Sequence, residues 1–125
     1  MEMITNAVNW FEIPVSNFDR AKDFYSKIFD YEMPTMPMGP VHMGFLPHER
    51  EKGVGGAIVH GEGTPSKDGV QIYLNGGADL QVVLDRVPGA GGDVVVPKTE
   101  IGQGFGYFAF FIDTEGNRIG LHSMA

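Results

Sequence analysis

Two periodicities of hydrophobic and polar residues recur in the same order along this chain. Residues 7–15 contain the apolar run of a strand, and the segment after them carries apolar residues at the spacing of one face of a helix. These helix positions are Ala21, Phe24, Tyr25, Ile28 and Phe29. Residues 31–40 contain three prolines and three methionines, which favour an extended edge or a loop. Short strands are then predicted at residues 41–46 and 55–60.

The second half of the chain repeats this order. Residues 69–75 predict a strand, and residues 78–87 predict a helix whose apolar side chains again recur every three or four positions. Pro88 and the glycines after it are expected to end this helix. Residues 93–97 then predict a strand, and residues 98–104 a loop.

The tail of the chain predicts a β-hairpin. Aromatic residues gather in a strand at residues 107–111, a turn containing a glycine follows at residues 113–117, and residues 118–122 form the return strand. Residues 55–60 are a shorter version of this ending, and they close the first half. The chain is therefore interpreted as a duplication.

Each half has the order β-α-β-β-β, with a period of about 60 residues. One such half leaves a sheet face uncovered, so the two halves should pack together around a shared cleft. We expect a single domain over residues 1–125, with a first module at about 5–61 and a second at about 69–123. Residues 61–68 are the most linker-like stretch between them.

Charge and composition exclude some classes of binding partner and some kinds of catalytic chemistry. Nine Lys and Arg residues stand against sixteen Asp and Glu residues, and the formal net charge is −7. A chain without a basic run is not expected to bind nucleic acid or an anionic membrane. The absence of cysteine excludes thiol catalysis, disulfides and cysteine-bound zinc. No apolar run is long enough to span a bilayer, and a cytoplasmic location is expected.

Three segments give the chain a family resemblance: residues 15–25 after the first strand, residues 91–94 after the second helix, and residues 111–121 at the end. With these segments the chain resembles the vicinal oxygen chelate superfamily, which includes glyoxalase I, extradiol dioxygenases, and bleomycin- and fosfomycin-resistance proteins. The resemblance covers nearly the whole chain. It implies an α+β fold in which two βαβββ modules pair to form a cleft-bearing, barrel-like sheet, often in a homodimer. It does not fix the reaction, because this fold hosts many chemistries.

In the resembling enzymes a divalent metal lies in the cleft, and its four ligand positions fall here at Trp10, Ile58, Gln71 and Gly120. Only Gln71 has a ligating atom, and a single amide oxygen does not hold a metal against water. The usual metal site is therefore expected to be absent, and no cofactor is predicted. Without a metal, the enediolate chemistry of glyoxalase I has no Lewis acid.

A second constellation lies two residues further along each strand, on the same face if the register is kept. It consists of Glu12, His60, Tyr73 and His122. A carboxylate and two imidazoles could form an acid–base pair, a polar part of a pocket, or a site for one divalent metal held by Glu12, His60, Gln71 and His122. The other reading is that these residues end their strands in solvent, since a shift of one residue would turn them outward.

Three functions follow from these patterns. The first is binding of a small, partly aromatic or apolar molecule in the cleft without the usual metal. The second is a metal-dependent lyase or dioxygenase-like enzyme with the rearranged Glu/His site. The third is an interaction subunit whose cleft is filled by side chains. The predicted pocket residues are Trp10, Glu12, Ile58, His60, Gln71, Tyr73, Tyr107, Gly120 and His122, and no catalytic residue is assigned.

Overall fold

The computed structural model describes residues 1–49 and 51–125 and contains two modules of the predicted order. In the first module, β1 (Trp10–Pro14) leads into α1 (Phe18–Phe29). The strands β2 (Thr35–Met38), β3 (Val41–Phe45) and β4 (Gly55–His60) follow. They form a four-stranded sheet A in the order β1-β4-β3-β2, in which β1 and β4 are parallel and the other pairs antiparallel.

The second module has the same topology. Strand β5 (Tyr73–Asn75) is followed by α2 (Leu80–Leu84) and α3 (Val87–Ala90). The strands β6 (Asp93–Glu100), β7 (Tyr107–Ile112) and β8 (Arg118–Ser123) complete sheet B in the order β5-β8-β7-β6. The duplication is confirmed, because in each module the last strand pairs in parallel with the first.

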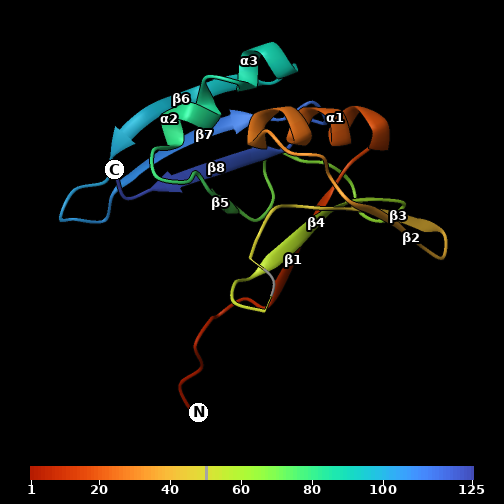
Figure 1. The fold of residues 1–125 in the computed structure, drawn as a ribbon, viewed down its shortest axis with the longest axis horizontal. Helices are drawn as coiled ribbons and strands as arrows, with labels where there is room; N and C mark the ends of the chain where they lie inside the picture. The colour runs from red at the N-terminus through yellow and green to blue at the C-terminus, as the bar shows by residue number, and fades with distance from the viewer. Residues whose placement is uncertain (50) are drawn as a thin grey trace.

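Sheets A and B are separate, so the expected barrel-like sheet is not closed. Figure 1 shows the three helices along one side of the molecule, with sheet B beneath them and β1 and β4 directed away toward the N-terminus. None of the helices that the structure describes is both long and apolar enough to cross a membrane.

Three expected elements differ from the observed ones. The helix predicted at 78–87 is divided into α2 and α3, because Pro88 cannot bond to the carbonyl of Leu84 and instead occupies the first turn of α3. Strand β6 continues to Glu100, whereas residues 35–38 form an edge strand, which is one of the two alternatives predicted for them. Strand β5 is shorter than predicted and begins at Tyr73.

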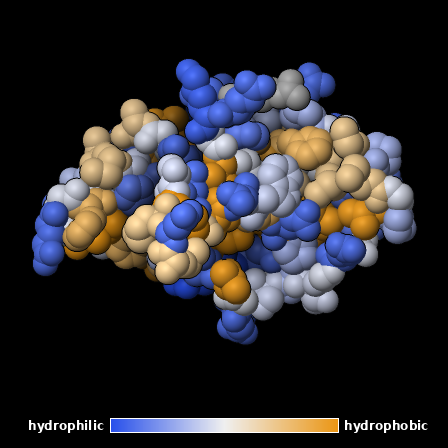
Figure 2. Space-filling view, turned by 90° about the horizontal axis from the view of Figure 1, so that it is seen from below, coloured by the Kyte–Doolittle hydropathy of each residue, from blue (hydrophilic) through white to orange (hydrophobic). Residues whose placement is uncertain are grey.

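Apolar side chains reach the surface near these edge strands. Met36 and Met38 on β2 are 47% and 53% exposed, and Phe105, in the loop between β6 and β7, is 62% exposed. Figure 2 shows apolar residues in separate patches at both ends of the molecule and near its middle, with polar residues between them. The two ends correspond to the β2–β3 hairpin and the β6–β7 loop of Figure 1.

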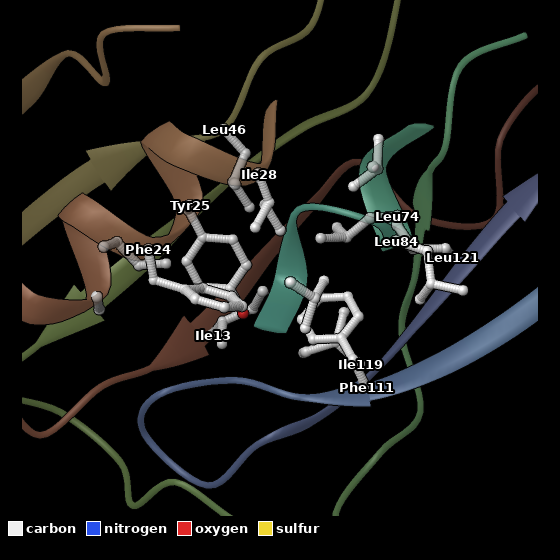
Figure 3. Close-up of a cluster of buried hydrophobic side chains, with 14 of the residues drawn as sticks. Ile13, Phe24, Tyr25, Ile28, Leu46, Leu74, Leu84, Phe111, Ile119 and Leu121 are labelled. Carbon is white, nitrogen blue, oxygen red and sulfur yellow. The ribbon is translucent and has the colours of Figure 1, made fainter. Parts of the chain in front are cut away.

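One hydrophobic core contains residues of both modules. Phe24 and Tyr25 of α1 pack beside Phe111 of β7, and the ring centroids of Phe24 and Phe111 are 5.8 Å apart (Figure 3). Ile13 and Ile58 of sheet A and Leu121 of sheet B join the same cluster. Each of these side chains is at most 2% exposed, so the face of each sheet that carries them is covered.

A polar junction, formed by Asn17, Arg20, Tyr25, Asp113, Glu115 and Asn117, joins the start of α1 to the β7–β8 turn. The Glu115 side chain is fully buried, and its Oε1 accepts hydrogen bonds from the backbone N–H groups of both Ser16 and Asn17. Arg20 donates to both carboxylate oxygens, at 2.7 and 3.1 Å. The buried Tyr25 hydroxyl donates to Asp113 at 2.7 Å. The junction therefore holds the closing hairpin against the first module.

Candidate functional site

A hollow of about 970 Å³ lies between the start of β1, residues 46–49 and 52–56, and the approach to β5. Its walls are mainly apolar, and its size is within the range of about 300–1,000 Å³ that is typical of small-molecule pockets. Four of the predicted pocket residues line it: Trp10, Glu12, Gln71 and Tyr73. We refer to this hollow as the cleft.

Trp10 and Glu12 form one wall of the cleft. The Trp10 ring is 42% exposed and meets the ring of Phe45 edge-on, with 6.1 Å between centroids. Its indole N–H donates to the Glu12 carboxylate at 3.2 Å. The pair presents an apolar ring beside an acceptor, which suits a ligand with both aromatic and polar parts.

Tyr73 on the opposite wall packs on a glycine. Gly120 is its partner on β8, and a Cβ at this position would lie 2.6 Å from the Tyr73 ring and 3.1 Å from the Phe110 ring. Only glycine allows both rings to approach the strand so closely. The Tyr73 and Phe110 centroids are 5.6 Å apart, and Phe108 is 5.4 Å from Phe110. Tyr73, Phe108 and Phe110 therefore form an aromatic shelf on the face of sheet B opposite the core.

The polar groups beside this shelf are Arg118 and Gln71. The guanidinium carbon of Arg118 lies 3.9 Å from the Phe110 ring centroid, and its Nη1 donates to Gln71 Oε1 at 3.1 Å. The Gln71 Nε2 donates to the carbonyls of Ile72 and Arg118, at 3.1 and 3.4 Å. Gln71 thus lines the cleft and contacts Arg118, which makes the shelf continuous with the cleft.

Phe108, Phe110 and Arg118 were not among the pocket residues predicted from the sequence. The period-2 pattern of residues 118–122 contained a usable signal, because Ile119 and Leu121 are apolar whereas Arg118 and His122 are polar. Strand alternation therefore assigns Arg118, Gly120 and His122 to one face. The register that places Phe110 opposite Gly120 required the structure.

The prediction that Ile58 lines the pocket is wrong, because Ile58 lies in the hydrophobic core and lines no part of the cleft. The register pairs Ile13 with Ile58 and Glu12 with Ala57, so Ile58 faces away from Glu12. His60 is two residues further and shares the Ile58 face, opposite His42 on β3. Glu12 and His60 therefore do not converge.

His122 and Tyr107 also differ from expectation. The Nε2–H group of His122 donates to the Phe105 carbonyl at 2.7 Å, which ties the β6–β7 loop to β8. Tyr107 lies on the other face of β7 from Phe108 and packs against the core. The Lys98 ammonium stands 4.6 Å from the Tyr107 ring centroid. Neither His122 nor Tyr107 lines the cleft, although His122 is the partner of Phe108 on the neighbouring strand.

The residues present do not fit the metal of the resembling enzymes. Trp10 and Gly120 have no ligating side-chain atom, and the space beside Gly120 is taken by the rings of Tyr73 and Phe110. The amide of Gln71 is engaged by Arg118 and by two carbonyls. Among residues 1–49 and 51–125, no group of three or more His, Asp or Glu side chains gathers to hold a metal ion.

The sequence places the protein in a known family that shares this fold. Residues 7–121 match the Glyoxalase/Bleomycin resistance protein/Dioxygenase superfamily, and the chain belongs to it. The resemblance seen in the sequence is thereby confirmed. The family has members with different activities, so membership alone does not assign one here.

Proteins of similar sequence or structure include a binding protein and an enzyme. A glyoxylase-like domain-containing protein of Didymella fabae is 29% identical in an alignment of 121 residues, which covers 88% of this chain and 88% of that protein. The antibiotic binding protein TnmS3 from Streptomyces sp. CB03234 is 25% identical, with a TM-score of 0.63 and 98% of both chains covered. A glyoxalase I mutant from Zea mays has a TM-score of 0.69 at 15% identity. That match covers 92% of this chain but only 45% of the maize chain, and it shows the fold alone.

Proposed function

We propose that this protein binds a small, partly aromatic molecule in the cleft without using the usual metal of the superfamily. The observation that carries this proposal is at Gly120. Where the resembling enzymes have a metal ligand, this chain has no side chain, and the rings of Tyr73 and Phe110 close over the position. The site thereby offers stacking surfaces instead of ligating atoms.

The similarity to TnmS3 supports the proposal, because that protein is described as antibiotic binding and is covered along almost its whole length. The rearranged metal site remains the alternative, with lyase or dioxygenase-like activity. It is not favoured, because Glu12 and His60 lie on opposite faces of sheet A and His122 is bonded to the Phe105 carbonyl.

Trp10 is the only tryptophan, so its fluorescence reports directly on the cleft. Titration with a panel of polycyclic aromatic molecules should quench or shift this fluorescence, and chelator should not change the affinity. Tyr73→Ala should weaken binding, because it removes an exposed stacking ring of the cleft, whereas Val82→Ala on the exposed side of α2 should not. If no aromatic probe binds, or if binding requires a retained stoichiometric metal, the proposal is wrong.

A homodimer is part of the proposal, and the exposed methionines of β2 support it. Met36 and Met38 lie on one side of an edge strand, where a second copy could cover them. Light scattering should give twice the chain mass for the unmodified protein and the monomer mass for the Met36→Glu/Met38→Glu variant. A monomeric unmodified protein would remove the dimer from the proposal and leave the ligand site. The cytoplasmic location stays a prediction.

A further inference from the structure

Arg118 is a positive group beside the cleft that forms no ion pair among the described residues. Ion pairs among the described residues involve Arg20, Lys27, Lys52 and Lys98. Arg118 has no carboxylate partner in that part of the chain, although the protein carries a net charge of −7. Its described bonds are one to Gln71 and the stacking contact with Phe110. A guanidinium has five N–H donors, so most of them are available.

The side chain is held in one orientation despite this. Stacking on Phe110 fixes the plane of the guanidinium, and the bond from Nη1 to Gln71 Oε1 fixes its rotation. Gln71 is fixed in turn, because its Nε2 donates to the carbonyls of Ile72 and Arg118. Gln71 is therefore a positioning residue for Arg118. A planar donor fork that is oriented before binding loses little entropy when it meets a carboxylate.

The fork is continuous with a surface for an aromatic ring. Phe110 lies between Tyr73 and Phe108 and carries Arg118 on its face. Tyr73 and Gln71 line the cleft directly. Phe110 itself is only 8% exposed, so the ring open to a ligand is Tyr73, which is 51% exposed. A planar molecule stacked on Tyr73 would place a group on its edge toward the guanidinium, because Tyr73 and Arg118 both pack against Phe110.

From this arrangement we infer that the ligand is a planar aromatic molecule with a carboxylate on its edge, and that Arg118 selects for that carboxylate. The inference rests on the proposed function and adds the charge of the ligand to it. The acidic surface of the protein would otherwise repel such an anion, so the selection depends on a local contact and not on the overall field.

Two matched probes test the charge requirement: 2-naphthoate, which is ionised at neutral pH, and its uncharged amide, 2-naphthamide. By calorimetric titration the unmodified protein should bind the naphthoate about tenfold more tightly, as expected for a charge-assisted bidentate contact. Arg118→Gln should remove this preference and leave the affinity for naphthamide within about twofold. Arg118→Lys should restore only part of the preference, because an ammonium does not match the carboxylate in two bonds.

Lys67→Gln is the charge control, since it removes one positive charge from an exposed residue outside the cleft. It should keep the preference for naphthoate. Equal affinity of the unmodified protein for the two probes would overturn this inference and leave the proposed function standing. An equal loss of preference in Lys67→Gln and Arg118→Gln would also overturn it, because the effect would then be the net charge. If neither probe binds, the proposed function fails as well.

Discussion

Two regions of the β7–β8 hairpin differ in whether their charged side chains have a partner of opposite charge. At the turn, the carboxylate of Glu115 is fully buried and is matched by Arg20 and two backbone N–H groups. On the strand three residues later, Arg118 has a stacking partner and one amide, but no carboxylate among the described residues. The difference helps to distinguish structural charges from functional ones. A charged side chain that is paired with other groups of the protein stabilises the fold, whereas a charged side chain that is held in place without a counter-charge can bind a ligand.

The pKa shifts at the junction agree with this distinction. Burial alone would raise the pKa of Glu115, but hydrogen bonds from Arg20, the Asn17 backbone and Thr114, together with the charge of Arg20, place this pKa below its ordinary value. The hydrogen bond and charge of Glu115 raise the pKa of Arg20. Burial, and then the charge and hydrogen bond of Asp113, raise the pKa of Tyr25 well above its ordinary value, so its hydroxyl remains a donor.

Replacing Glu115 by alanine should have the largest effect on the comparison. The variant leaves two backbone N–H groups at the start of α1 without their acceptor and removes the link to Arg20. We expect the free energy of unfolding to fall by about 3 kcal/mol, the upper end for charge-assisted hydrogen bonds, because Arg20 is 52% exposed and water can replace part of what it loses. Urea denaturation followed by circular dichroism measures it. Glu49→Ala is the control, because its pair with Lys52 is exposed and should contribute less than about 1 kcal/mol. Similar losses of unfolding free energy in both variants would show that the buried carboxylate of the junction stabilises the protein no more than an exposed ion pair does.

Acid should reproduce a smaller part of this loss. The ordinary pKa of a Glu is 4.5, and the folded protein holds Glu115 below it. Above this ordinary value both states are ionised and the stabilisation is complete; as the pH falls, the unfolded state takes up the proton first and stability is lost until the folded pKa is passed. Unfolding free energies measured from neutral pH to below 4.5 should therefore fall less steeply for Glu115→Gln than for the unmodified protein. Parallel slopes would mean that Glu115 does not contribute to acid sensitivity.

Tyr25→Phe tests the other half of the junction. It removes one buried hydroxyl that donates to Asp113, while Asn117 still donates to the same carboxylate oxygen at 3.1 Å. A hydrogen bond to a charged group contributes about 1.5–3 kcal/mol, so we expect a loss near the middle of this range. Thermal and urea unfolding would measure it. Affinity for aromatic probes should remain unchanged, and a loss of binding would contradict the separation between junction and cleft.

Gly120→Ala tests the aromatic shelf instead of the polar junction. The new Cβ would lie 2.6 Å from Tyr73 and 3.1 Å from Phe110, and the half-exposed Tyr73 ring can move aside. Because one neighbour can yield, we expect a loss of only about 1 kcal/mol in stability, at the lower end for overpacking. Affinity for aromatic probes should fall more clearly than stability, since the shelf is displaced. Gly69→Ala is the control, because a Cβ there meets nothing within 4 Å.

The sequence predicts the fold well because periodicity is a local property. The helix face from Ala21 to Phe29 and the alternation in β7 and β8 both appear within a few residues of chain. The site depends on register, which is not local. The sequence prediction placed Ile58 in the cleft because its register along β4 was wrong by one residue. In the structure Ile58 pairs with Ile13 in the core. The contact between Arg20 and Glu115 spans 95 positions, so no short pattern could reveal it.

Arg118→Gln should have the smallest effect on stability. It tests the difference between Arg118 and Arg20 most directly, because the same substitution can be made at both positions. Its loss removes a stacking contact with Phe110 and a bond to Gln71, but it leaves no buried carboxylate without a partner. We expect a change in unfolding free energy below about 1 kcal/mol, as for a partly exposed cation–π contact. Arg20→Gln should destabilise the protein more, because Glu115 then keeps its burial without its cation. Urea denaturation of both variants measures the difference. If Arg118→Gln is the more destabilising of the two, then Arg118 is part of the structural framework, and its missing carboxylate says nothing about a ligand.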